Sequence, residues 1–117
     1  MSQDIENTRQ LGSINQKVVA DGESLPAVRL KDGSRVQTGT VATMLHNIAL
    51  YNLQTSTEEQ RRDIEQELLS AIPTLVKVGL FDLFSPDEWG AGDNPGRKFV
   101  GECAKAYFAG QTTDIRR

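Results

Sequence analysis

The sequence holds few of the residues that build disulfides and metal sites. Its 117 residues include one cysteine and one histidine. A single cysteine cannot form an intrachain disulfide, and one cysteine with one histidine falls short of the ligand sets of structural zinc. The sequence therefore predicts no metal site and no cofactor.

A strong charge of one sign and a long apolar run are also missing. The chain has 13 basic and 16 acidic residues, a formal net charge of -3, and neither half of it is a basic arm. Binding to nucleic acid through bulk charge is therefore disfavoured. No apolar stretch has the length of a membrane span, and the polar start at residues 1–6 lacks the features of a signal peptide. We expect a cytoplasmic protein without membrane contact.

What the sequence does contain is the composition of one globular domain. Hydrophobic residues make up 38% and charged residues 25% of the chain, which supports a packed core and argues against disorder. We expect a single domain over residues 1–117. The last helix is expected to end at Gly110 and to leave a loose tail at 111–117.

Apolar spacing predicts a mostly helical α+β fold of four or five helices. The first helix is expected over residues 4–20, and a capping box at 57–60 begins another that continues past a kink or break at a proline to Val78. A second capping box at 85–88 begins a short helix, and the last helix is expected over 95–109. The inner face of the helix that begins at the first capping box is expected to hold Ile64, Leu68, Ala71 and Leu75.

Alternating apolar residues around a turn predict one two-stranded antiparallel hairpin over residues 26–38. A three-residue loop at 31–33 places Val28 opposite Val36 on the apolar face. The same register gathers basic residues on the outer face, where like charges opposite each other are unfavourable. We interpret that face as solvated edge-strand charge, or as a surface for an acidic or phosphate-bearing partner. Its members are Arg29, Lys31 and Arg35.

The most apolar segment, residues 40–53, is expected to be the central helix around which the others pack. At about 100° per residue, its apolar side chains share one face. We expect Met44, Leu45 and Ile48 on that face to be almost fully buried. A narrow polar stripe runs along the other side of the helix.

His46 and Cys103 are the residues from which a nucleophilic site could be assembled. Cys103 would be the nucleophile and His46 the general base. No carboxylate stands three or four residues from His46 to orient it, and Cys103 lies mid-helix on an apolar arc. We therefore expect both residues to be structural, which argues against an enzyme.

Residues 90–98 carry a pattern that would suit a bound anion. The segment joins several glycines to an Asn-Pro helix start, where backbone N–H groups and two cations would face the ligand. The glycine spacing differs from that of a phosphate-binding loop, and no strand precedes it, so a flexible connector is the other interpretation. The candidate anion-binding residues are Asn94, Gly96, Arg97 and Lys98.

Apolar side chains outside the expected core suggest a subunit interface. Leu50 falls by angle at the centre of the polar stripe of the 40–53 helix, which would leave it exposed. Phe81, Phe84 and Trp89 concentrate aromatic surface in a short connector, although core packing is the ordinary explanation of such residues. These four residues are the candidate interface.

The sequence as a whole favours a non-enzymatic interaction module that forms a homo-oligomer or binds a protein partner. The first alternative is a small domain that binds an anionic small molecule or nucleotide through residues 90–98. The second is an enzyme whose site is assembled from remote residues. Phosphate-bearing ligands should raise the melting temperature only if the first alternative is correct.

Overall fold

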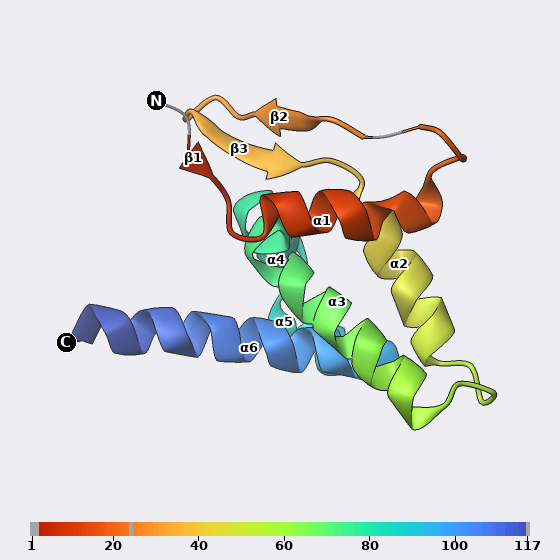
Figure 1. Cartoon of the computed structure of the whole chain (residues 1–117). Helices are drawn as coiled ribbons and strands as arrows, with labels where there is room; N and C mark the ends of the chain where they lie inside the picture. The colour runs from red at the N-terminus through yellow and green to blue at the C-terminus, as the bar shows by residue number, and fades with distance from the viewer. Residues whose placement is uncertain (1–2, 24, 117) are drawn as a thin grey trace.

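A computed structural model describes residues 3–23 and 25–116. The helices are α1 (Thr8–Ile14), the 3₁₀ helix η1 (Asn15–Val18), α2 (Thr40–Tyr51), α3 (Glu58–Lys77), α4 (Leu80–Leu83), α5 (Pro86–Gly90) and α6 (Pro95–Arg116). The strands are β1 (Gln3–Asp4), β2 (Ala27–Arg29) and β3 (Ser34–Gln37). The chain is thus a mostly helical α+β protein, in which the sheet lies over α1 and α1 lies over the longer helices (Figure 1).

The predicted hairpin is β2 and β3, which pair antiparallel. Val28 pairs with Val36, and Gly33 closes the loop with a φ of 92°, as a three-residue loop with glycine in the left-handed position requires. The register is therefore confirmed. β1 adds a short parallel strand on the other edge of β3, and no pattern in the sequence predicts this strand.

The predicted helix over 4–20 is wrong at both ends. Asn7 takes a left-handed φ of 69°, so helical geometry cannot run from β1 into α1. After α1 the chain tightens into η1 at Asn15, whose Nδ2 donates to the Thr38 carbonyl at 2.9 Å and to Thr40 Oγ1 at 3.1 Å. These bonds tie the N-terminal segment to the chain that enters α2.

α2 forms where the sequence predicts it, but a different face is buried. Met44 and Ile48 are buried as expected, whereas Leu45 is 58% exposed, so that prediction is wrong. Thr43 and Asn47 are buried in its place. Their polar groups form hydrogen bonds inside the fold. The apolar pattern of the helix could not predict this, because it assigns polar side chains to the solvent.

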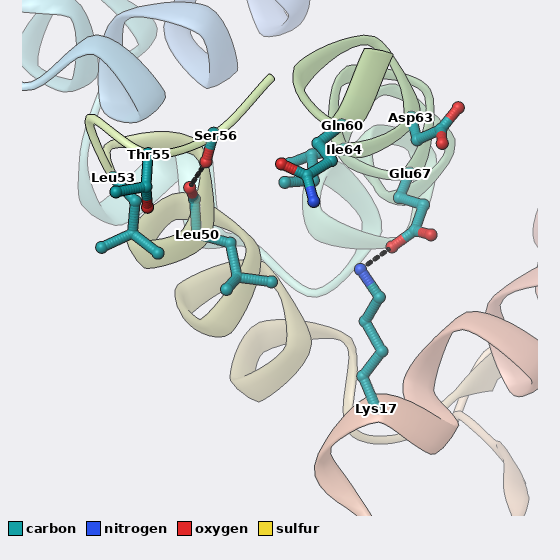
Figure 2. Close-up of a pocket in the computed structure, with 9 residues that line it drawn as sticks. All are labelled: Lys17, Leu50, Leu53, Thr55, Ser56, Gln60, Asp63, Ile64 and Glu67. Carbon is teal, nitrogen blue, oxygen red and sulfur yellow. Dashed lines mark hydrogen bonds and ion pairs between the residues drawn. The ribbon is translucent and has the colours of Figure 1, made fainter. Parts of the chain in front are cut away.

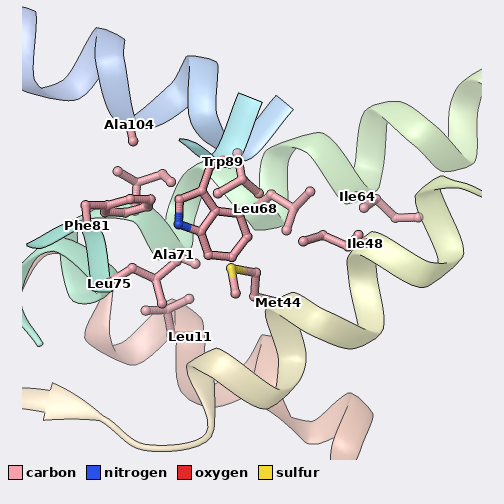
Figure 3. Packing of buried hydrophobic residues seen from close by; sticks show 12 residues of the cluster. Leu11, Met44, Ile48, Ile64, Leu68, Ala71, Leu75, Phe81, Trp89 and Ala104 are labelled. Atoms are coloured by element: carbon pink, nitrogen blue, oxygen red, sulfur yellow. The ribbon is translucent and has the colours of Figure 1, made fainter. Parts of the chain in front are cut away.

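α3 holds the central position that the sequence assigns to the 40–53 helix. It packs against α1, α2, α4 and α6. The predicted capping box is confirmed, because Thr57 Oγ1 accepts from the Gln60 N–H at 3.1 Å and Gln60 Oε1 accepts from the Thr57 N–H at 2.8 Å. Figure 3 shows the buried side chains of α3 meeting those of α1 and α2. The predicted inner face is confirmed as buried: Ile64, Leu68, Ala71 and Leu75.

Pro73 lies inside α3 without ending it, since the helix continues to Lys77. Proline has no N–H, so the preceding turn loses a helical hydrogen bond. In that turn, Asn7 Nδ2 donates to the Ser70 carbonyl at 2.9 Å. The carbonyl freed by the proline is that of Leu69, four residues back, so Asn7 binds the next carbonyl along the helix.

α6 continues through Gly110 to Arg116, whereas the sequence predicts an end at Gly110. Gly110 has no positive φ, and a glycine within a helix costs only about 1 kcal/mol relative to alanine. The single-domain boundaries and the loose tail at 111–117 stay predictions, and residue 117 lies outside the described residues.

α5 and α6 approach each other closely at Gly101. A Cβ at this position would lie 2.7 Å from the Pro86 carbonyl oxygen and 3.0 Å from the Gly90 nitrogen. Both are backbone atoms, so neither can turn away as a flexible side chain would. The contact between the two helices therefore requires glycine here.

Replacement of Gly101 with alanine should lower the free energy of unfolding by about 1–3 kcal/mol, because the added methyl forces the backbone apart. Gly110→Ala is the matched control in the same helix, since a Cβ there meets open space. Urea denaturation measures both variants. A Gly101→Ala midpoint equal to that of Gly110→Ala would contradict the close approach.

Thr57→Ala should lower the free energy of unfolding by about 1 kcal/mol, because it removes the side-chain acceptor at the start of α3. Thr55→Ala is the control, since the Thr55 side chain is exposed. Thermal denaturation followed by circular dichroism compares the two. If both variants have the same melting temperature, the cap contributes nothing to the stability of the protein.

Candidate functional site

A cleft of about 390 Å³ opens between η1, the end of α2 and the first turns of α3 (Figure 2). One side is formed by the end of α2 and the loop that follows it, and the other by α3. Its lining residues are Lys17, Leu50, Leu53, Thr55, Ser56, Gln60, Asp63, Ile64 and Glu67.

Three polar side chains form a closed ring at the η1 end of the cleft. Lys17 Nζ lies 2.6 Å from Glu67 Oε1 and donates to Asn47 Oδ1 at 2.7 Å. Asn47 Nδ2 in turn donates to Glu67 Oε1 at 3.1 Å. Asn47 is 1% exposed, so the ring satisfies a buried amide and joins η1 to α2 and α3.

Leu50 lies at this cleft and not on an open surface. It is half-buried and packs against the core, and Figure 2 shows its side chain directed into the space between α2 and α3. The expectation of an exposed Leu50 is therefore wrong, because the polar side of α2 faces α3. The Leu50 carbonyl accepts from Ser56 Oγ at 2.7 Å, which fixes the loop after α2.

The three aromatic interface candidates are divided between core and surface. Phe81 and Trp89 are buried, with ring centroids 6.1 Å apart, so they have little surface to offer a partner. Phe84 is exposed next to Leu83, the most exposed large hydrophobic residue of the described chain at 71%. The surface part of this segment is therefore Leu83 with Phe84.

The candidate anion site has its backbone donors already engaged. The Gly96 N–H donates to Asn52 Oδ1 at 2.8 Å, and the Arg97 N–H donates to Asn94 Oδ1 at 3.0 Å. Asn52 Nδ2 also donates to Asn94 Oδ1 at 2.8 Å. Two asparagines thus cap α6 and hold it against the end of α2. In the sequence, the signal for this contact was that Asn52, a polar residue, falls by angle on the buried side of the 40–53 helix.

The two cations of that segment are also not converging on a common point. Arg97 Nη2 donates to the Glu88 carbonyl at 2.8 Å, and its guanidinium carbon lies 5.6 Å from the Trp89 ring centroid. Lys98 is exposed and lines a different hollow, between α5 and α6. Arg97 therefore packs α6 onto α5.

His46 and Cys103 lie on different elements and share no cavity among the described residues. His46 is exposed on α2, whereas Cys103 is half-buried in a groove beside α3. Burial raises the pKa of the Cys103 thiol to about 11, and the nearby Glu102 and Glu65 carboxylates add to the effect. A thiol with this pKa is protonated at neutral pH, which does not suit a nucleophile.

The basic face of the hairpin has the predicted register. Arg29 pairs with Arg35 across β2 and β3. At the turn, Asp32 forms an ion pair with Lys77 of α3, and this bond holds the pKa of the Asp32 carboxyl well below its usual range. The hairpin tip is thereby attached to the helical layer.

α2 presents an apolar surface to solvent that is defined here as the α2 outer face: Val41, Ala42, Leu45 and Ala49. All four residues are exposed, with Val41 at 43% and Leu45 at 58%. None of the 12 residues of α2 is an aspartate, glutamate, lysine or arginine. The outer face is therefore both apolar and uncharged.

The family profile described as "Domain of unknown function (DUF7709)" matches residues 9–108. The chain belongs to the DUF7709 family. The DUF7709 match runs from α1 into α6, so it includes both the cleft and the α2 outer face. No curated protein and no solved structure matches the chain significantly.

Residues 3–23 and 25–116 of the DUF7709 chain contain neither a membrane-spanning helix nor a cluster of metal ligands. No helix there is long and apolar enough to cross a membrane. No group of 3 or more histidine, cysteine, aspartate or glutamate side chains there is placed to hold a metal ion.

Cys103 should react with iodoacetamide at pH 8 about 100-fold more slowly in the folded protein than in urea. The reason is that its raised pKa leaves about 100-fold less of the reactive thiolate in the folded protein. Mass spectrometry of timed samples measures the rate. Rapid alkylation of the folded protein at neutral pH would contradict the burial and restore Cys103 as a candidate nucleophile.

Proposed function

We propose that this DUF7709 protein is a non-enzymatic interaction module that self-associates through the α2 outer face. The observation that carries the proposal is the orientation of α2. Leu45 is 58% exposed, while Asn47 on the same helix is 1% exposed. A helix that only covers a core places these residue types the other way round, and exposed apolar surface of this kind is typical of protein contacts.

A second copy of the chain is the occupant that fits this face. Two copies with a net charge of -3 each repel one another, and α2 carries no aspartate, glutamate, lysine or arginine that an interface built on it would bring into contact. Its exposed His46 stands beside the four apolar residues of the α2 outer face. In a two-fold dimer the same surface meets itself, so Leu45 of each copy would lie near the axis. The small Ala42 and Ala49 would allow the two helices to approach closely.

A stable dimer needs more surface than one short helix provides, on the order of 1,000 Å² or more in total. Leu53, 49% exposed just beyond the end of α2, would extend the apolar contact. The anion-binding alternative has no comparable support, because the first N–H groups of α6 already donate to Asn52 and Asn94.

Leu45→Asp should convert the associated form to a monomer, because it places a charge on each side of the two-fold contact. Sedimentation at micromolar concentrations measures the mass, and circular dichroism checks the fold. Leu83→Asp is the control, since Leu83 is even more exposed but lies on α4. A wild-type mass of 12.9 kDa at every concentration, or equal dissociation in both variants, would refute the proposal.

A further inference from the structure

We propose that the cleft between η1, α2 and α3 binds an organic cation that carries an apolar chain, the chemistry of an alkylammonium group. This goes beyond self-association and does not depend on it. Leu50, which lines the cleft, is about 140° from Leu45 around the axis of α2 at about 100° per residue. The cleft and the four residues of the α2 outer face therefore lie on different sides of the helix, and Leu53, just beyond its end, borders both.

The apolar part of the ligand has a matching surface on both sides of the cleft. Leu50 and Leu53 line it from the end of α2, and Ile64 lines it from α3. Leu50 and Ile64 point into the same space (Figure 2). A hydrocarbon chain placed there would remove water mainly from Leu50 and Leu53, since Ile64 is already buried, and this favours binding in proportion to the apolar area covered.

The sign of the ligand charge follows from the ionised residues of the cleft. Lys17 is the cation among its lining residues, against the carboxylates of Asp63 and Glu67. The Lys17 ammonium is already bound to Glu67 and Asn47, so it has little attraction left for an anion. Asp63 forms no ion pair with any described residue. The uncompensated charge of the cleft is therefore negative.

The position of the two carboxylates strengthens this preference. Asp63 and Glu67 stand four residues apart on α3, so they lie on adjacent turns of one face, where like charges repel. Lys17 already compensates Glu67, so a ligand cation at the rim beside Asp63 would neutralise the carboxylate that is left unpaired, without breaking the ring at Asn47. Ile64 is next to Asp63 in sequence, which places the apolar surface beside the charge.

A free alkylamine and a lysine side chain of a partner protein share this chemistry. The test uses the whole ¹⁵N-labelled protein and n-hexylammonium chloride, followed by amide chemical shifts. We expect saturable shifts at the cleft, including Gln60 and Ile64. Methylammonium, which lacks the chain, and hexanoate, which reverses the charge, should produce no saturable shift there.

Matched variants separate the charge from the chain. Asp63→Asn should weaken hexylammonium binding about threefold or more, whereas Glu59→Gln, an exposed acid of the same helix outside the cleft, should leave it unchanged. Lys17→Gln keeps hydrogen-bond donors toward Glu67 but removes the competing cation. It should therefore tighten binding of hexylammonium, the opposite of what an anion site would show.

Three results would overturn the proposal. They are the absence of saturable shifts with hexylammonium, equal binding of hexanoate, and equal affinity in Asp63→Asn and Glu59→Gln. Nα-acetyl-lysine methylamide identifies the source of the cation. If this compound binds with an affinity equal to that of hexylammonium, the ligand is a lysine side chain of a partner protein. If hexylammonium binds and this compound does not, the ligand is a free amine. The Leu45→Asp variant should bind hexylammonium normally, so this test succeeds or fails independently of self-association.

Discussion

Asn47 is a buried amide on α2 whose partners come from two other elements, and the arrangement of the helices depends on it. Its carbonyl oxygen needs the Lys17 ammonium of η1, and its N–H needs the Glu67 carboxylate of α3. A buried amide without these partners would be unfavourable. Because both partners lie on one side, that side of α2 must face inward. Leu45 is then carried to the outside, and the ring at Asn47 closes one end of the cleft.

Asparagine side chains repeat this role elsewhere in the chain. Asn7 joins the segment before α1 to α3, and Asn15 joins η1 to the entry of α2. Asn52 reaches from the end of α2 to the first N–H of α6. There the helices are so close that a Cβ on Gly96 would lie 2.9 Å from Ile48 Cγ2. Asn7 and Asn15 act through their amide N–H groups alone, whereas Asn52 uses both ends of its amide, since it donates to Asn94 and accepts from the Gly96 N–H.

The features that the sequence predicted correctly are those determined by neighbours along the chain. The Thr57 capping box, the pairing of Val28 with Val36 and the inner face of α3 each depend on residues within a few positions. The orientation of α2 could not be predicted in this way. It depends on Lys17 and Glu67, which lie 30 and 20 residues away from Asn47.

The candidate sites show the same difference between features set by neighbours along the chain and features set by distant residues. Asn94 was correctly placed at the start of the last helix, but the amide donors assigned to an anion there are used by Asn52, 44 residues away from Gly96. The cleft was not predicted, because its two walls come from the end of α2 and from α3, and its inner end comes from η1. Only the spacing of Gln60, Ile64 and Glu67 on one face of a helix was present in the sequence to indicate it.

The sheet, α1 and η1 form a layer that is attached to the longer helices largely through polar side chains. The attachments are Asn7 to Ser70, Lys17 to Glu67 and Asp32 to Lys77, with Leu11 as the main apolar anchor. The centre of α3, by contrast, is held by apolar packing. Ions screen the two ion pairs, Lys17 with Glu67 and Asp32 with Lys77, and leave the apolar packing untouched. Opening should therefore begin in this layer and be promoted by salt, and α2, whose buried Asn47 shares the ring with Lys17, should loosen with it, while the apolar contact between α3 and α6 is the last to be lost.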